Sequence, residues 1–324
     1  MSHSSIRGVA VAVAIGAALA AGHAGAQAWP TKTVRIVVPF GPGGGTDIQG
    51  RLLGKKFTES MGQTFVVDNR AGAAGLIGAE IVAKSPADGY NILFTTASLA
   101  VNVSLYKKGP IDPVKDLTPV SWISSVPLVL VVHPSVPVKT VKELVALAKK
   151  RAGRMNVASN GSGTTSHLSI EMLKQMAGVD VTHIPYKGGG PAMTAMLTGE
   201  VDFTFATALA AQPHIKGGKV KPLAVTTAKR SSTFPDLPTM DSIYPGFESD
   251  NWYAMFLPAG APKEVVSKLN SEIVKALKSP DVRDFITKEG GDPVGSSPDE
   301  LAKYFKREVD KYAKVIKAGN ITAE

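Results

Sequence analysis

Three consecutive glycines follow a short apolar run near the start of the chain, and this arrangement could bind an anion. Residues 34–38 read VRIVV, which is typical of a buried strand. The loop FGPGGG follows at 40–45, and Thr46 and Asp47 then give a capping signal for a helix over 47–61. Backbone N–H groups at a helix N-terminus carry partial positive charge and donate to carboxylates or phosphates. A glycine-rich turn without any ligand fits the same residues.

The glycine spacing excludes the common nucleotide-binding loops. From Gly41 or Gly43, the motif G-x-G-x-x-G needs a third glycine where Thr46 or Ile48 stands. A Walker motif fails around Gly54, because two lysines follow it instead of a lysine and a hydroxyl residue. A carboxylate is therefore the anion that suits this loop, rather than the phosphates of a nucleotide.

A second loop of the same kind lies in the middle of the chain. A short strand at 156–158 opens into SNGSGTT, which contains Ser159, Gly161, Thr164 and Thr165, and a helix is predicted over 166–176. The hydroxyl groups can donate to a carboxylate, although Thr164 or Ser166 can equally well serve only as the cap of the helix. Two such loops in the two halves of the chain predict an anion clamp.

Several side chains near these loops have two interpretations. Phe40 fits either the core or the wall of a ligand pocket, and Asp47 fits either a cap that fixes the glycine loop or an acceptor for an ammonium group or water. Asp202 fits either a turn residue or a contact for a ligand amine or hydroxyl. Lys187 either contacts the ligand through its positive charge or is a solvated surface residue. His167 is a lone histidine, and such a residue is more often a packing or hydrogen-bonding residue than a ligand contact.

Strands and helices alternate along the chain, which predicts an α/β fold with two parallel-sheet units. Ligands bind such sheets at the carboxyl ends of strands, where Thr96 and Ser98 stand. The second unit starts near Val126, so we expect two domains with a cleft between them. The expected strands are 34–38, 64–67, 90–95, 128–132, 156–158, 181–185, 201–205, 223–227 and 251–258, and the expected helices are 47–61, 71–83, 141–152, 166–176, 192–197, 263–278 and 298–318.

The first 28 residues read as a secretory signal peptide. Arg7 precedes an apolar run at 8–21, and AQA at 26–28 places the predicted cut between Ala28 and Trp29. The alternative is an apolar anchor that stays attached. The chain has no cysteine, which excludes a lipidated cysteine at the cut and any disulfide. Export in soluble form to a bacterial periplasm is the interpretation that we favour.

Composition and spacing argue against several other functions. The net charge of +9 is spread along the chain, and its basic clusters at 149–151 and 229–230 lack interleaved aromatic residues, so we expect no nucleic acid partner. The histidines have no metal-binding spacing, and Ser162 lacks the first glycine of a G-x-S-x-G motif. We therefore expect no metal, no cofactor and no enzyme activity. An enzyme that acts on a carboxylate is the less favoured alternative.

Motifs along nearly the whole mature chain resemble those of one family. They are WPTKTVRIVVPFGPGGGTDIQGR, VVDNRAGAAGLIGAE, ADGYNILFTT, NVASNGSGTTSHL, HIPYKGGGPAMTAMLTGEVDF and WYAMFLPAGAP, in the order in which the family carries them. The chain resembles the Bug-type (TctC-like) periplasmic solute-binding proteins of tripartite tricarboxylate transporters. The resemblance implies capture of a small carboxylate by closure of two Rossmann-like domains, the Venus-flytrap architecture. Family ligands are di- and tricarboxylates, acidic amino acids and aromatic acids.

The resemblance also implies the domain limits, the partners and the ligand contacts. Domain one comprises 29–127 and 252–324, and domain two comprises 128–251, with crossings near 126–132 and 251–257. The implied partners are the carboxylate and the membrane subunits of the transporter, and we expect a monomer. A periplasmic sensor that presents its ligand to a signalling receptor is the alternative. The implied ligand-binding residues are Phe40, Gly41, Gly44, Gly45, Asp47, Thr96, Ser98, Ser159, Gly161, Thr164, Thr165, Tyr186, Lys187, Gly188 and Asp202.

Overall fold

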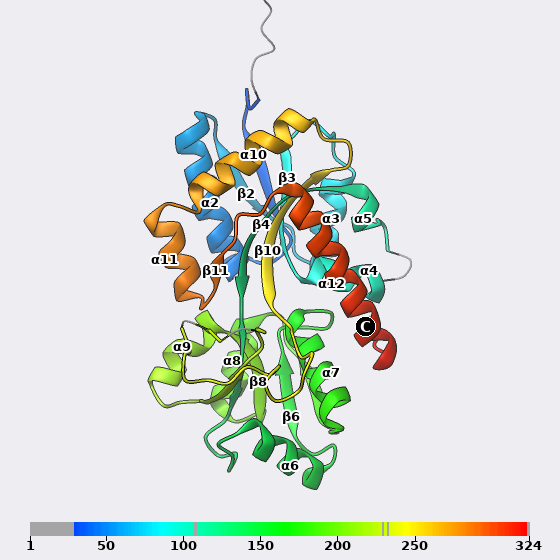
Figure 1. Cartoon of the computed structure of the whole chain (residues 1–324), viewed down its shortest axis with the longest axis vertical. Coiled ribbons are helices and arrows are strands. Elements are labelled where there is room, and N and C mark those ends of the chain that lie inside the picture. The colour runs from blue at the N-terminus through cyan, green and yellow to red at the C-terminus, as the bar shows by residue number, and fades with distance from the viewer. Residues whose placement is uncertain (1–28, 107–108, 229, 232, 323–324) are drawn as a thin grey trace, which may run out of the picture.

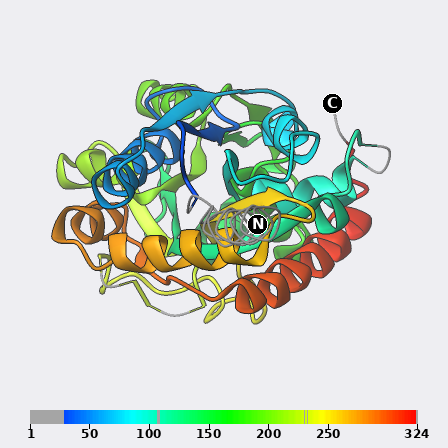
Figure 2. The same ribbon diagram turned by 90° about the horizontal axis from the view of Figure 1, so that it is seen from above.

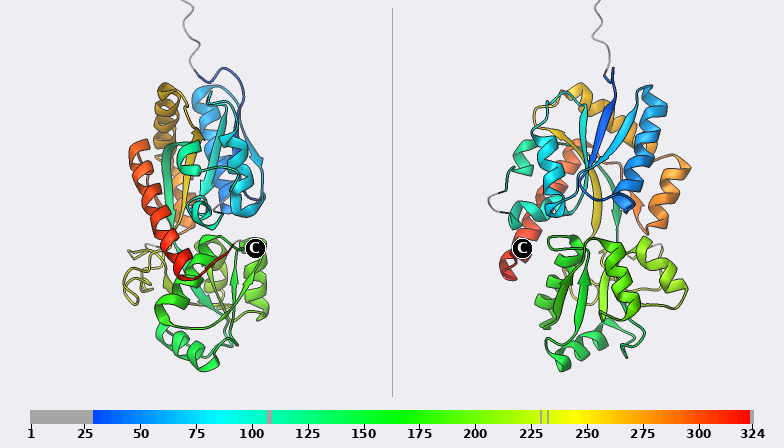
Figure 3. Two further views of the ribbon diagram at one scale, coloured as in Figure 1. Left: turned by 90° about the vertical axis from the view of Figure 1, so that its right-hand side faces the viewer. Right: turned by 180° about the vertical axis from the view of Figure 1, so that it is seen from behind.

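The strands of the protein form two separate sheets, and we call the halves that contain them the first and the second domain. The computed structural model describes residues 29–106, 109–228, 230–231 and 233–322. The first domain lies above the second in Figure 1, and Figure 3 shows the same division from the side and from behind. The predicted signal peptide at 1–28 lies outside the described residues.

The first sheet is mixed and has helices on both faces. Its order is β11 (Asp292–Pro293), β4 (Leu117–Val126), β10 (Asn251–Pro258), β3 (Asn91–Thr96), β1 (Val34–Val38) and β2 (Phe65–Asn69). The pairs β1–β2 and β1–β3 are parallel, whereas β10 runs antiparallel to β3 and β4. One face is covered by α2 (Gly45–Met61), α10 (Lys263–Ala276) and α11 (Pro280–Lys288).

The opposite face of the first sheet is covered by α3 (Leu76–Ala83), α4 (Ser98–Leu105) and α12 (Pro298–Ala318). The view from above in Figure 2 shows the two groups of helices on opposite sides, with α10 in gold and α12 in red. The short helices η2 (Ala73–Gly75) and α5 (Pro113–Asp116) lie in connections. Apolar side chains from both layers are buried against the sheet, so it forms the middle layer of the domain.

The second sheet has the same three-layer construction. Its order is β7 (Thr182–Pro185), β6 (Asn156–Ser159), β8 (Phe203–Thr207), β5 (Leu128–Val132) and β9 (Lys221–Val225). Strand β6 pairs in parallel with β7 and β8, whereas β5 runs antiparallel to β8 and β9. Helices α6 (Val141–Arg151) and α7 (Thr165–Ala177) pack on one face, and α8 (Gly189–Thr198) and α9 (Ala208–Lys216) on the other.

Two chain segments connect the domains. Pro127 alone separates β4 of the first sheet from β5 of the second, and the chain returns from β9 to β10. The Oγ of Ser125 donates to Oδ2 of Asp250 at 2.9 Å, which ties the two connections together. Burial raises the pKa of Asp250 to about 7. Strands β5 to β9 fall within the expected second domain, whose limits at 128–251 stay a prediction.

The sequence located most elements but missed those that depend on distant contacts. It did not predict β4, β11, α4, α9 or α11, and the helix expected over 71–83 begins only at Leu76. Gly72 and Gly75 have φ values of 140° and 96°, so the chain turns there instead of continuing a helix. The strand expected at 201–205 runs over Phe203–Thr207, and the strand expected at 223–227 runs over Lys221–Val225.

Candidate functional site

The first glycine loop ends at an N-terminus that has no side-chain cap. Helix α2 begins at Gly45, and its N-cap residue is Gly44, which makes no side-chain capping bond. The capping role expected for Thr46 and Asp47 at the helix start is therefore wrong. Helix geometry leaves the N–H groups of Gly45, Thr46 and Asp47 without an acceptor inside the helix. These donors, together with the helix dipole, make the end of α2 a site for an anion.

Asp47 holds the glycine loop in place from within the helix. Its Oδ2 accepts from the backbone N–H of Gly43 at 2.9 Å, and its Oδ1 lies 3.0 Å from Nη2 of Arg51. Burial works to raise the pKa of Asp47, but hydrogen bonds from Gly43, Arg51 and Asn69 outweigh it and lower that pKa. The carboxylate is thus ionised and paired, as the structural interpretation of Asp47 predicts.

The second glycine loop satisfies many of its own donors. The N–H of Gly161 donates to Ser159 Oγ at 3.1 Å, and the N–H of Gly163 donates to Nδ1 of His167 at 3.2 Å. The side chain of Thr164 caps α7 by accepting from the N–H of His167 and donates to the carbonyl of Gly161 at 2.7 Å. Capping is therefore the role of Thr164 in this structure, and His167 is a hydrogen-bonding residue of the loop.

A pair of stacked histidines contacts this second loop. The rings of His167 and His183 lie 4.2 Å apart with an interplanar angle of 9°. Nε2 of His183 is 2.6 Å from Ser159 Oγ, so both histidines contact the loop directly. The hydroxyl of Ser159 is thereby used inside the protein.

Thr165 ends this loop, and its side-chain hydroxyl is still free to donate a hydrogen bond. It is the first residue of α7 and is 3% exposed. Among the described residues, its Oγ1 has no hydrogen-bond partner. A buried hydroxyl without a partner is costly, so its presence at a helix N-terminus points to a ligand atom as the missing partner.

The two loops approach each other through the η2 connection. A β-carbon placed on Gly75 would lie 3.3 Å from the ring of Phe40, and one placed on Gly163 would lie 3.4 Å from Cβ of Ala74 and nearer still to Leu105. First-domain residues therefore contact the tip of the second loop. We call this boundary, where both domains make contact, the seam.

Other predicted residues lie along the same boundary. Thr96 Oγ1 donates to Ser98 Oγ at 3.3 Å where β3 ends and α4 begins. The backbone N–H groups of Tyr186 and Gly188 donate to the carbonyls of Ser159 and Asn160, which fastens the loop after β7 to the second glycine loop. The hydroxyl of Tyr186 instead donates to Glu200 at 2.8 Å, beyond the far end of α8.

Asp202 lies away from the seam. Its Oδ2 accepts from the N–H of Asn156 at 2.7 Å, at the start of β6, whereas Ser159 ends the same strand. Three residues of strand separate the two ends by about 10 Å. This hydrogen bond fits the alternative of a turn aspartate, and the ligand contact of Asp202 stays a prediction. Lys187 is exposed.

Two residues at the seam were not predicted from the sequence. Tyr253 on β10 and Glu289 after α11 are buried, and both face the first turn of α2. A β-carbon placed on Gly45 would lie 2.7 Å from the Tyr253 hydroxyl and closer still to Oε1 of Glu289. Neither residue stands near a glycine loop in the sequence, so only the fold brings them to this site.

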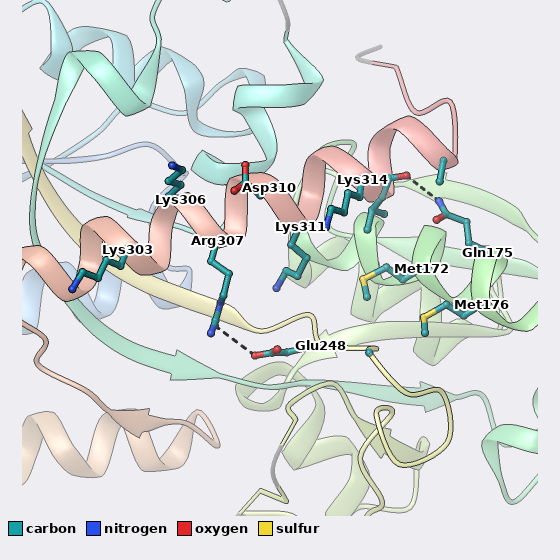
Figure 4. Close-up of a pocket in the computed structure, with 13 residues that line it drawn as sticks. Met172, Gln175, Met176, Glu248, Lys303, Lys306, Arg307, Asp310, Lys311 and Lys314 are labelled. Carbon is teal, nitrogen blue, oxygen red and sulfur yellow. Dashed lines mark hydrogen bonds and ion pairs between the residues drawn. The ribbon is translucent and has the colours of Figure 1, made fainter.

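A concave surface lies on the side of the molecule, where α12 crosses from the first domain to α7. This groove of about 890 Å³ is shown in Figure 4. Arg307 lies 4.0 Å from Glu248, and the amide of Gln175 donates to the carbonyl of Val315. The remaining labelled residues are Met172, Met176, Lys303, Lys306, Asp310, Lys311 and Lys314. None of the predicted site residues lines it, so the glycine loops remain the candidate site.

The donor set at the seam suits an anionic oxygen ligand. It offers backbone N–H groups of two helix N-termini and the Thr165 hydroxyl. Within the part of the chain that the structure describes, no group of three or more histidine, aspartate or glutamate side chains could hold a metal ion. None of the described helices is both long enough and apolar enough to span a bilayer.

Comparisons with known proteins agree on one family. A family model described as "Tripartite tricarboxylate transporter family receptor" matches residues 50–321. BugT of Bordetella pertussis is 37% identical over 295 residues, which cover 90% of this chain and 90% of BugT. The solved structure of R. palustris Rpa4515 with adipate has a TM-score of 0.84 and 38% identity, covering 91% of this chain and 99% of that one.

A further solved structure, MatC from Rhodopseudomonas palustris with bound malate, has a TM-score of 0.81 and 32% identity. The match covers 89% of this chain and 100% of MatC. These likenesses confirm the α/β fold in two domains that the sequence predicts.

Proposed function

Because this chain belongs to the tripartite tricarboxylate transporter receptor family, we propose that it binds a small dicarboxylate at the seam and delivers it to a membrane transporter. Proteins of this family bind solutes. The relatives with adipate and with malate support a carboxylate as the ligand of this chain too. Binding without chemical change is part of the proposal.

One observation carries the proposal: two helix N-termini with open donors lie at one boundary between domains. The start of α2 offers only backbone N–H groups, and the start of α7 adds the unpartnered hydroxyl of Thr165. Each end can hold one carboxylate group, and each charge-assisted hydrogen bond contributes about 1.5–3 kcal/mol. A ligand with two carboxylates would bridge the domains, and this contact favours the closed arrangement.

The cellular setting follows from the same family membership. The proposed location is the periplasm, with residues 1–28 removed on export, and the proposed active form is a monomer. The proposed partners are the membrane subunits of the transporter. Domain two is proposed to comprise 128–251, because the connections at Pro127 and Asn251 are where the chain passes between the sheets.

A thermal-shift screen of the mature protein tests the proposal. The panel contains adipate, malate and other dicarboxylates, each paired with its uncharged diamide. At 100 times its Kd, a ligand stabilises the folded protein by about 2.7 kcal/mol, which raises the melting temperature by several degrees. We expect acids to produce this rise and diamides to produce none. The proposal would be overturned if no acid raised the melting temperature, or if the diamides did so equally.

A further inference from the structure

A buried carboxyl group lies against the end of α2 that the proposed ligand contacts. Glu289 follows the last residue of α11 and is 1% exposed. Its Oε1 and the hydroxyl of Tyr253 occupy the space in which a β-carbon of Gly45 would stand. The carboxyl group is therefore aimed at the first turn of α2, where the open N–H groups are.

Glu289 is also enclosed by the second domain. A β-carbon placed on the neighbouring Gly290 would lie 2.8 Å from Cβ of Ala208, the first residue of α9. The Oγ1 of Thr233 donates to the carbonyl of Thr287 at 3.1 Å on the same side. The carboxyl group thus lies at the seam, between the end of α2 and the second domain.

The carboxyl group lacks the partners that an ionised form would need. Within the described residues, Oε2 of Glu289 has no hydrogen-bond partner. An ionised carboxylate removed from water needs donors for its oxygens, whereas a neutral acid needs fewer and itself carries an O–H donor. Burial raises the pKa of Glu289 to about 8, so the neutral form predominates at pH 7.

We propose that the protonated carboxyl group of Glu289 donates a hydrogen bond to the ligand carboxylate at the N-terminus of α2. This inference rests on the proposed function and adds a contact to it. The ligand class is an ionised carboxylate that is bound while Glu289 keeps its proton. A ligand ammonium group at this position would need the opposite state, an ionised Glu289.

The charged groups around Glu289 leave it without a cationic partner among the described residues. On α2, Asp47 pairs with Arg51, and Lys56 pairs with Asp281 of α11 at 2.8 Å. The next neighbours in the chain that carry charge, Lys288 and Asp292, are exposed. From β10 the titratable group is Tyr253, and burial raises its pKa well above 10, so its hydroxyl stays neutral. The second domain contributes Ala208, Ser231 and Thr233, which do not titrate.

The proposed contact makes affinity depend on pH with a defined sign. Loss of the proton from Glu289 places a negative charge beside the ligand carboxylate, which opposes binding. Binding requires the proton on Glu289, and the pKa of Glu289 in the protein without ligand is about 8. The affinity for the ligand should therefore fall about 30-fold between pH 6.5 and 9.5. Dicarboxylate ligands stay ionised throughout this range, so the change is assigned to the protein.

Calorimetric titration tests the contact with adipate or malate, whichever gives the larger thermal shift. Titrations run from pH 6.5 to 9.5 in two buffers with different ionisation enthalpies, which also count protons. For the wild type we expect the 30-fold fall and uptake of about one proton at pH 9.5. Glu289→Gln keeps the shape and a neutral donor, so it should bind within about threefold of wild type at pH 6.5 and show no fall.

Asp250→Asn is the matched control, because Asp250 is another buried acid with a raised pKa but contacts the connecting strands. The ligand affinity of this variant should still fall above pH 8, as in wild type. The inference is overturned if wild type takes up no proton at pH 9.5, if Glu289→Gln keeps the fall, or if a folded Glu289→Gln no longer binds at pH 6.5. If neither acid binds wild type at any pH, the proposed function is wrong, and so is this inference, which depends on it.

Discussion

The two glycine loops at the seam are built alike, but they differ in the donors that they leave open. The loop before α2 has a glycine N-cap, and its one buried carboxylate, Asp47, fixes Gly43 without covering the helix end. The loop before α7 uses Gly161, Gly163 and Thr164 for its own hydrogen bonds. The first loop therefore suits any carboxylate, while the second adds one side-chain hydroxyl, that of Thr165, to the open backbone N–H groups at the start of α7.

This difference separates affinity from selectivity. Backbone N–H groups bind any carboxylate and cannot be removed by a side-chain change, so the first loop supplies affinity for a class of ligand. A single hydroxyl with fixed direction reads the position of one oxygen atom, so Thr165 and its neighbours select among members of the class. Mutations that act on one loop at a time should reveal this division.

The largest effect should come from crowding the first turn of α2. In Gly45→Ala the new β-carbon clashes with the Tyr253 hydroxyl and Glu289, so the first turn must shift. At least two backbone N–H groups then no longer point at the ligand carboxylate. Loss of two charge-assisted bonds predicts an affinity about 100-fold lower or worse, and overpacking costs about 1–3 kcal/mol of stability. Calorimetry and urea unfolding measure the two quantities.

Gly41→Ala is the control for stability, because no heavy atom of the described residues lies within 4 Å of a β-carbon at Gly41. It should unfold like wild type. If Gly45→Ala bound the ligand as tightly as wild type, the ligand would not use the end of α2.

A smaller effect should follow from removing the open hydroxyl of the second loop. Thr165→Val keeps the shape of the side chain and should weaken ligand binding about 10- to 100-fold, because one charge-assisted bond is lost. Its unfolding free energy should stay unchanged or rise, since the hydroxyl has no partner among the described residues. Chemical denaturation and calorimetry on the same samples check both parts.

The neighbouring Thr164→Val should show the reverse pattern. It removes the cap of α7 and should cost about 1 kcal/mol of stability, with a smaller loss of affinity. If Thr165→Val were the less stable of the two variants and bound ligand normally, the division between capping and ligand contact would be wrong.

The smallest effect on binding should come from Asp47→Asn. The variant loosens the glycine loop, so affinity should fall only a few-fold. Because the pKa of Asp47 is lowered on folding, its stabilising contribution is present above about pH 4 and is lost as pH falls through the folded-state pKa. Urea unfolding should therefore show a deficit at pH 7 that shrinks at pH 3. A deficit that stayed constant with pH would contradict the ionised pair with Arg51.

Local patterns in the sequence predicted the two loops, whereas distant contacts produced the rest of the site. A strand, a glycine loop and a helix start are consecutive, so 34–47 and 156–165 could be recognised directly. Tyr253 reaches α2 through the order of the first sheet, in which β10 lies beside β3, and Glu289 reaches it because α11 packs on the same face of that sheet as α2. The sequence also placed the start of β8 two residues too early, and Asp202 stands at the amino end of that strand because it begins at Phe203.

Backbone amide spectra of the mature protein, titrated with the tightest-binding acid of the screen, test the central claim most directly. The claim is that N–H groups at two helix starts hold one ligand. We predict saturable shifts of the amide signals of Gly45 and Thr46 in the first domain and of Thr165 and Ser166 in the second, all with one Kd. Shifts confined to one domain, or centred on the α12 groove around Lys306 and Arg307, would contradict the account.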